Sequence, residues 1–126
     1  MIIVYGITNC DTVKKARAWL VAQGLAHEFY DFKKYGVPAG RLADWSHSVG
    51  WEKLLNRQGT TWRKLDPATQ AAVVDVASAQ ALILANPSIV KRPVVEWLGP
   101  GQKISETSVG FDALRWSKMA GAASKR

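Results

Sequence analysis

The residue best placed to do chemistry is Cys10, the single cysteine of the chain. It follows an apolar run at residues 2–5 and precedes a helix-like stretch from Asp11 to Gln23. A cysteine at this junction lies beside the unpaired N–H groups of a helix start, whose positive partial charge stabilises the reactive thiolate. We therefore interpret Cys10 as a nucleophile. The alternative is that it serves only as a small buried apolar residue, which is common for a free cysteine.

The residues after the cysteine add to this interpretation. Lys14 and Lys15 bring positive charge one turn further along the expected helix. Thr12 either donates a hydrogen bond to the sulfur or merely occupies the first helical turn, and the sequence leaves both open. Asp11 is better explained as a helix cap than as an acid catalyst, because aspartate is a favoured capping residue.

A lone nucleophilic cysteine limits the redox chemistry that the chain can complete by itself. The second position of a C-x-x-C pair would be residue 13, which is Val13, so no internal thiol can resolve a mixed disulfide. The resolving thiol must come from outside, and glutathione is the abundant candidate. One cysteine also excludes an internal disulfide framework and fits a reducing compartment.

The composition is that of a globular domain. Of 126 residues, 48% are hydrophobic and 21% are charged, and the formal net charge is +7. The basic residues occur singly or in doublets, which favours a solvated surface over a nucleic-acid-binding patch. His27 and His47 lie far apart without ligand spacing, so we expect no metal site. No apolar run approaches the roughly 18 residues of a membrane span, and the apolar start predicts a strand rather than a signal peptide.

The elements that would position Cys10 follow from the pattern of apolar residues. The first forty residues predict a strand, the Cys10 helix ending near Gly24, a second strand at 27–32 and a loop at 33–40. Residues 41–86 are helical in character. Asp66-Pro67 predicts a helix start there, and the Ala-rich stretch from Ala68 to Ala85 predicts one helix or two that meet near Ser78.

Strand character returns after Pro87. A strand at 94–98, a turn at 99–101 and a short return strand at 103–104 predict a hairpin. The final helix is expected at 111–119, with its inward face formed by Phe111, Leu114 and Met119, and residues 120–126 are expected to fray. The order β-α-β, helical segment, β-β-α predicts a single α/β domain with a thioredoxin-like fold and a central helical insertion at about 41–86.

Three separated stretches of the chain resemble one known family. They are residues 5–16 around Cys10, residues 54–62, and the sequence Lys91-Arg92-Pro93-Val94-Val95. Together they resemble the arsenate reductase (ArsC)/Spx family, and within it the YffB-like branch. The resemblance implies a thioredoxin-like fold with a helical insertion, a cytoplasmic location, no bound cofactor, and a nucleophilic cysteine served by glutathione as external reductant.

The resemblance also identifies partners for the cysteine. ArsC arsenate reductases pair it with three arginines, of which Arg92 matches the second. The first position is occupied by Asn56, with Arg57 beside it, and the region after the hairpin near Ser105 has no arginine. Loss of these anion ligands disfavours arsenate reduction. We expect a glutathione-dependent thiol reductase in which Arg92 and Arg57 suit the carboxylates of glutathione.

Two residues are expected to shape the site rather than to bind. Pro93 should form a cis peptide bond beside the cysteine loop, as thioredoxin-like folds do, and this would bring Arg92 near Cys10. Asn9 directly precedes the cysteine in the same loop.

The alternative function is an Spx-like regulator that binds RNA polymerase without turnover. Spx proteins usually carry C-x-x-C, which Val13 excludes here, so the enzyme is favoured.

Overall fold

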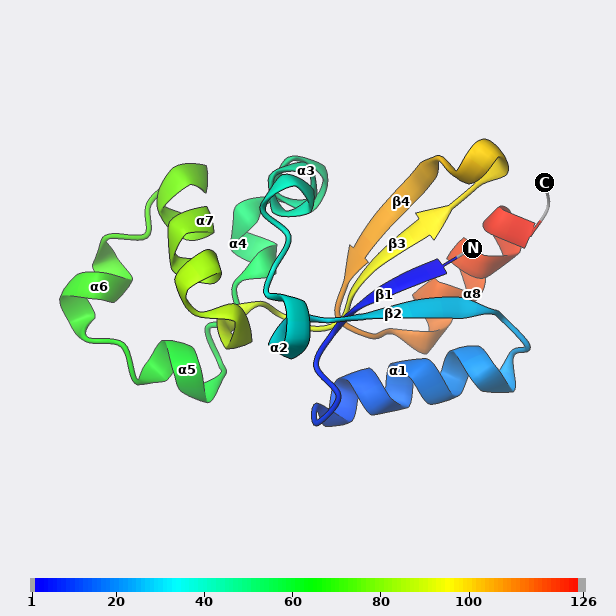
Figure 1. Ribbon diagram of the computed structural model, residues 1–126, viewed down its shortest axis with the longest axis horizontal. Helices are drawn as coiled ribbons and strands as arrows, with labels where there is room; N and C mark the ends of the chain where they lie inside the picture. The colour runs from blue at the N-terminus through cyan, green and yellow to red at the C-terminus, as the bar shows by residue number, and fades with distance from the viewer. Residues whose placement is uncertain (1, 125–126) are drawn as a thin grey trace. The chain divides into compact units, whose positions relative to one another are not determined.

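The computed structural model describes the backbone of residues 2–124 and the side chains of residues 2–120. The chain divides into two compact units (Figure 1). The sheet unit combines the residues up to Lys33 with those from Arg92 onward, and the helical unit runs from Lys34 to Lys91. The helical unit is therefore longer in sequence, at both ends, than the insertion predicted at about 41–86.

The sheet unit is built on four strands in the order β2-β1-β3-β4. The strands are β1 (Ile2–Gly6), β2 (His27–Asp31), β3 (Val94–Leu98) and β4 (Ile104–Val109). Strand β1 pairs in parallel with β2 and antiparallel with β3, and β3 pairs antiparallel with β4. This mixed sheet with its flanking helices has the thioredoxin-like architecture that the sequence predicted.

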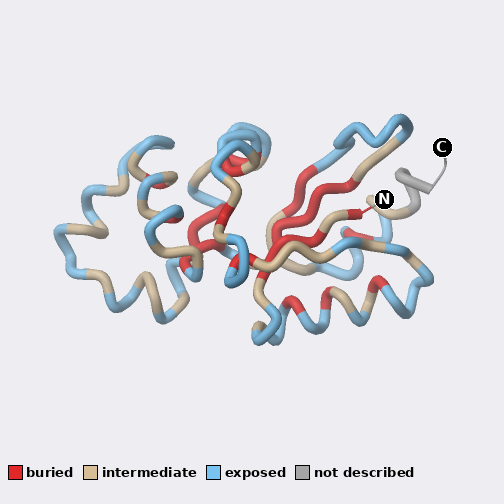
Figure 2. Tube along the Cα trace, in the orientation of Figure 1, coloured by how far each residue is buried: buried red, intermediate tan, exposed pale blue. Residues whose placement is uncertain are grey.

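One face of the sheet packs against α1 (Asp11–Ala22) and α8 (Ala113–Ser124), as Figure 1 shows. Alternate strand residues point into this core because successive side chains of a strand face opposite sides. The core cluster consists of Ile2, Val4, Ala16, Leu20, Val95, Trp97 and Trp116. Figure 2 shows the central strands of the sheet unit and the inner side of α1 as buried.

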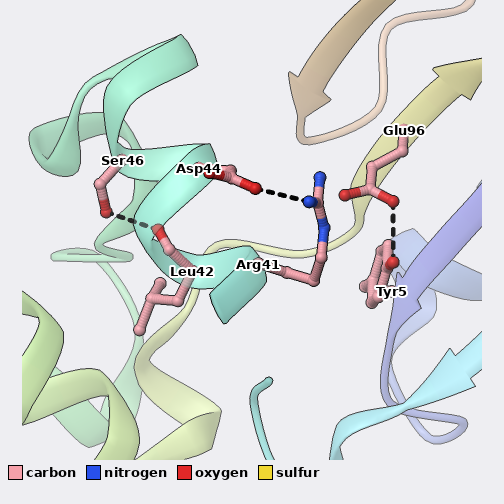
Figure 3. A network of polar contacts seen from close by, with 6 residues as sticks. All are labelled: Tyr5, Arg41, Leu42, Asp44, Ser46 and Glu96. Atoms are coloured by element: carbon pink, nitrogen blue, oxygen red, sulfur yellow. Dashed lines mark hydrogen bonds and ion pairs between the residues drawn. The ribbon is translucent and has the colours of Figure 1, made fainter. Parts of the chain in front are cut away.

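The other face of the sheet carries a buried polar pair. Tyr5 and Glu96 are 5% and 2% exposed, and the tyrosine hydroxyl donates a hydrogen bond of 2.8 Å to Oε1 of Glu96 (Figure 3). Tyr5 lies one residue after the core residue Val4, and Glu96 lies between Val95 and Trp97, so both side chains leave the apolar face. A buried carboxylate needs such a partner, which links β1 to β3 through side chains as well as backbone.

Helix α1 begins at the residue that was predicted to cap it, one residue earlier than expected. The N-cap is Cys10, whose backbone is extended at φ −102° and ψ 123°, and Asp11 is the first helical residue. The prediction that Asp11 caps this helix is therefore wrong. Its C-terminal end is as expected: Gly24 has φ +69°, its N–H donates to the Val21 carbonyl at 3.0 Å, and the N–H of Leu25 donates to the Leu20 carbonyl at 2.9 Å.

The helical unit is made of short helices. They are α2 (Phe32–Tyr35, which spans the junction of the two units), α3 (Ala39–Val49), α4 (Trp51–Leu54), α5 (Thr60–Arg63), α6 (Pro67–Ala71), α7 (Val76–Ala85) and the 3-10 turn η1 (Pro87–Ile89). The loop predicted at 33–40 is thus partly helical, because Phe32 is buried and anchors the turn of α2. Helices α3, α4 and α7 pack on one another around the buried Leu42, Trp45, Leu54 and Ile83.

Two helix starts in this unit explain where the Ala-rich stretch divides. Asp66 precedes Pro67 at the first position of α6, as predicted. Asp75 then caps α7 in a reciprocal capping box with Ser78, so the stretch forms two helices. The second helix starts before Ser78 rather than at it. Within α3, the hydroxyl of Ser46 donates to the Leu42 carbonyl at 2.8 Å, a contact that is drawn in Figure 3.

The C-terminal hairpin and helix differ from prediction in two details. The return strand β4 is longer than the two residues expected, and a 3-10 turn η2 (Pro100–Gln102) joins it to β3. Phe111 and Met119 pack against the core as predicted, but Leu114 is 72% exposed, and Trp116, 1% exposed, is the residue of α8 that is buried. Leu114 is two positions from Trp116 and therefore lies on the opposite side of the helix. Helix α8 extends to Ser124, and the remainder of the predicted frayed tail lies outside the described residues.

No helix among the described residues is both long enough and apolar enough to cross a bilayer.

Candidate functional site

The topology of the sheet brings Arg92, which is far from Cys10 in the sequence, close to it in the fold. Cys10 follows the C-terminal end of β1, and Arg92 precedes the N-terminal end of β3. These strands are antiparallel, with Tyr5 paired to Val94, so the two ends lie at the same edge of the sheet. The Arg92–Pro93 peptide bond is cis, as the family resemblance led us to expect.

Cys10 is a free thiol that is partly exposed. As the N-cap of α1 it accepts the first hydrogen bond of the helix, from the Lys14 N–H to its own carbonyl oxygen at 2.9 Å. Its side chain makes no capping hydrogen bond of regular geometry. The thiol nevertheless lies at the positive end of the helix, where the N–H groups of the first turn lack helical partners.

The surroundings of Cys10 lower the pKa of its thiol. Partial burial is the largest single influence and raises the pKa, because it disfavours the charged thiolate. The backbone N–H of Val13, the hydrogen bond and positive charge of the Arg92 side chain, and the N–H of Thr12 together outweigh it. The site therefore favours the nucleophilic form of the cysteine.

The other predicted residues of the sheet unit contribute in different ways. Thr12 acts through its backbone N–H, and its side chain is exposed. Asn9 is exposed in the turn before Cys10. Arg92 is the cationic side chain that lowers the pKa of Cys10. Lys14 and Lys15 are exposed on the first turns of α1. The anion-binding roles of Arg92 and Lys14 stay predictions.

Arg57 belongs to the helical unit and is exposed there. Its guanidinium carbon lies 5.9 Å from the ring centroid of Trp51 and 5.6 Å from that of Trp62, within range of cation–π attraction. Its predicted role with Arg92 in binding glutathione stays a prediction.

The absence of a third arginine has a structural counterpart. At the position where the family pattern would place it, Ser105 donates its hydroxyl hydrogen to the Trp97 carbonyl at 2.8 Å. The nearby Arg115 is on α8, where it lies 3.8 Å from Glu106 in an exposed ion pair. Position 105 therefore offers a short hydroxyl, already bonded within the hairpin, rather than an arginine.

Sequence reasoning missed a pocket of about 300 Å³ that runs along α1 beside the start of β2. Its polar lining residues are Thr8, Lys14, Arg17 and His27, and Val13 and Val21 supply apolar wall. The spacing of Cys10, Lys14, Arg17 and Val21 could have revealed it. Positions i, i+4, i+7 and i+11 share one side of a helix, so these residues form a stripe that begins at the cysteine.

Within the described part of the chain, no group of three His, Cys, Asp or Glu side chains is arranged to hold a metal ion. The site as observed is thus a thiol, an arginine and helix N–H groups.

A four-stranded mixed sheet flanked by α1 and α8, with a cysteine at the N-cap of α1 and a cis-proline before β3, defines a thioredoxin-like protein with one free cysteine. The family model described as ArsC family matches residues 5–119, and the chain belongs to that family.

Solved structures and a curated relative agree with this assignment. The structure of a protein named YFFB is 42% identical, covers 94% of this chain and 98% of its own, and superposes with a TM-score of 0.85. An arsenate reductase (ArsC) related protein from Brucella melitensis is 46% identical over 93% of this chain and 92% of its own, with a TM-score of 0.69. A global transcriptional regulator Spx from Streptococcus pyogenes is 28% identical over 102 residues, which are 75% of this chain and 71% of that protein.

Proposed function

We propose that this protein is a glutathione-dependent monothiol reductase in which Cys10 is the nucleophile. The observation that carries the proposal is the pairing of a thiol of lowered pKa with Arg92, in a chain that has no second cysteine. Membership of the ArsC family and similarity to a protein described as arsenate reductase related support an oxidoreductase.

The proposed reaction has two thiol–disulfide exchanges. The Cys10 thiolate attacks the glutathione sulfur of a mixed disulfide between glutathione and a substrate thiol, and the substrate thiolate leaves and takes a proton from water. The thiolate of a second glutathione then attacks the Cys10–glutathione disulfide, which releases Cys10 and oxidised glutathione. The net change is reduction of the mixed disulfide by one glutathione, and Arg92 stabilises the thiolate at the start and at the end of the cycle.

Arsenate is a less suitable substrate for this site. An oxyanion substrate brings negative charge to the thiolate, so it requires cations that offset both charges. In the sheet unit Arg92 is the one match to the three arginines of the arsenate reductase pattern, and Ser105 stands near the position of the third. We expect turnover of a small mixed disulfide to exceed turnover of arsenate.

The decisive experiment combines mass spectrometry with kinetics. Wild-type protein treated with oxidised glutathione should gain one glutathione, and turnover of a mixed disulfide should require glutathione. Cys10→Ser should lose both. A matched control places a cysteine on the exposed surface of α3, as Ser48→Cys in the Cys10→Ser background. It should form an adduct slowly and restore no turnover, because Ser48 lacks the helix start and Arg92.

The result that would overturn the proposal is a wild-type protein that neither forms the adduct nor reduces the disulfide. Binding of RNA polymerase by such a protein would support the Spx-like alternative instead. The more distant similarity to Spx gives that alternative less weight.

A further inference from the structure

The pocket along α1 differs in charge from an ordinary surface hollow. Lys14, Arg17 and His27 are among its lining residues, and none of the lining residues is acidic. Among residues 2–120, whose side chains the structure describes, neither Lys14 nor Arg17 forms an ion pair with a carboxylate. The pocket therefore has a cationic wall that the protein's described side chains do not neutralise.

Arg17 is held in place rather than extended into solvent. Its Nε–H donates a hydrogen bond to Nε2 of His27 at 3.3 Å, and its guanidinium carbon lies 4.3 Å from the ring centroid of Phe29. These contacts use Nε and one flat face of the guanidinium, so its Nη groups can serve a ligand. An arginine whose conformation is already fixed loses less entropy on binding a carboxylate.

The pocket has lining residues on both sides of Cys10 in the sequence, although Cys10 itself does not line it. Its lining begins at Thr8, two residues before Cys10, and continues with Lys14 and Arg17 on the stripe that the cysteine starts. The helical rise of 1.5 Å per residue places Lys14 about 6 Å and Arg17 about 10 Å from Cys10 along the axis. Helical side chains lean towards the N-terminus, so Lys14 extends back towards the thiol, whereas the guanidinium of Arg17 turns to His27 and Phe29 of β2.

We propose that this pocket is the carboxylate subsite for glutathione, with Lys14 and Arg17 binding one of its two carboxylates while its sulfur lies at Cys10. This inference rests on the proposed glutathione dependence. The sulfur of glutathione belongs to its central residue, so each terminal carboxylate lies within about two residue lengths, or roughly 7 Å, of it. That reach matches the rise of about 6 Å from Cys10 to Lys14, and Arg17 lies about one turn further along the same pocket wall.

The neighbouring lysines provide a matched test. Lys14 and Lys15 are both exposed on the first turns of α1, but only Lys14 lines the pocket. Lys14→Gln should raise KM for glutathione about two- to fivefold with little change in kcat, the range for an exposed ion pair. Lys15→Gln should leave KM unchanged. With β-mercaptoethanol as reductant, which has no carboxylate, the two variants should behave alike.

Arg17 and the ligand supply the complementary tests. Arg17→Lys keeps the charge but removes the planar fork, so it should also raise KM for glutathione. The glycyl ethyl ester of glutathione shows which carboxylate is bound. If the pocket holds the glycyl carboxylate, the ester raises KM of the wild type and abolishes the difference between wild type and Lys14→Gln. A difference that persists with the ester assigns the pocket to the γ-glutamyl carboxylate.

A binding measurement separates this inference from the proposed function. S-methylglutathione cannot react with Cys10, so its titration followed by NMR reports binding alone. Shifts of the Thr8, Ala18 and His27 amides, reduced by Lys14→Gln and not by Lys15→Gln, would support the pocket even if the protein showed no turnover. Glutathione-dependent turnover with equal KM in the two lysine variants, and no such shifts, would overturn the pocket and leave the proposed function standing.

Discussion

The sheet unit and the helical unit both bury tryptophan, but they are built from elements of very different length. In the sheet unit, two 12-residue helices, α1 and α8, pack on a four-stranded sheet. In the helical unit, α3 and α7 have 11 and 10 residues, but α4 and α5 have only four each and α6 has five. Helices this short are not stable by themselves, so tertiary contacts must hold them.

This difference determines where precise chemistry can be placed. Cys10 and Arg92 are attached to the ends of paired strands, so the hydrogen bonds of the sheet fix their approach. Arg57 follows the isolated β-bridge between Leu55 and Val90, in a turn between two short helices, and its ring contacts are local. We infer that the sheet unit carries the reaction, and the following predictions test that division.

The largest effect is expected from two buried tryptophans, Trp116 of the sheet unit and Trp45 of the helical unit. Trp116 packs edge-to-face on Trp97 at 5.1 Å and on Phe111 at 4.8 Å between ring centroids. Trp116→Ala should lower the free energy of unfolding by about 3–5 kcal/mol, as for other large aromatic truncations. The same change at Trp45, 0% exposed, should cost a similar amount. Denaturant titration measures both.

The pH dependence of Cys10 alkylation gives a separate test of the division between the units. In conditions where both remain folded, Trp45→Ala should preserve the pH dependence of Cys10 alkylation, because the groups that lower the pKa belong to the sheet unit. A marked shift of that dependence in Trp45→Ala would contradict the division of roles between the units.

The next effect concerns Arg92. Its hydrogen bond and charge lower the pKa of Cys10, so Arg92→Gln should move the midpoint of alkylation rate to higher pH. Arg92→Lys should preserve more of the pKa shift than Arg92→Gln does. It should still lower kcat/KM for glutathione by about tenfold or more, because a hydrogen bond to a charged group contributes about 1.5–3 kcal/mol. Arg63→Gln, an exposed arginine of α5, is the control. Equal midpoints in Arg92→Gln and wild type would remove Arg92 from the site.

A smaller effect is expected from His27 as the pH changes. Burial lowers its pKa below 6.5, with a smaller contribution from the charge of Arg17, while its hydrogen bond to the Leu25 backbone opposes them. The unfolded state therefore binds the proton more readily, so this contribution to stability is complete above about pH 6.5 and is lost as the pH falls towards the lowered pKa. His27→Gln should flatten the dependence of unfolding free energy on pH in that window. A slope identical to wild type would show that His27 titrates alike in both states.

The smallest effect is expected at Leu114. Because it is 72% exposed, Leu114→Ser should change the free energy of unfolding by no more than about 0.5 kcal/mol. Thermal unfolding beside Trp116→Ala measures the contrast within one helix. A loss comparable to that of Trp116→Ala would mean that α8 buries a different side in solution.

The sequence predicted the parts of the fold that depend on local signals. Gly24 marked the end of α1 because a left-handed backbone there favours glycine, and Asp66-Pro67 marked the start of α6 because proline suits the first helical position. The N-cap of α1 was misassigned because aspartate is the stronger capping residue, whereas the structure gives that position to Cys10.

Features that depend on packing between distant segments were harder to predict. The inward face of α8 is set by the rings of Trp19 and Trp97 against Trp116, which are far apart in sequence. The α1 pocket likewise needs His27 and Phe29 from β2 to hold Arg17. Its helical stripe and the strand at 27–32 were both visible in the sequence, but the contacts of Arg17 with that strand were not.

The discontinuity of the sheet unit has a consequence for the protein while it is being made. Cys10 and its helix leave the ribosome before the helical unit, and Arg92 leaves after it. During synthesis β2 is available to pair with β1 early, whereas β3 arrives only when residues 94–98 have been translated. The nascent chain therefore carries a thiol without its arginine. The contribution of Arg92 to the lowered pKa of Cys10 is therefore added only after the whole helical unit has been translated.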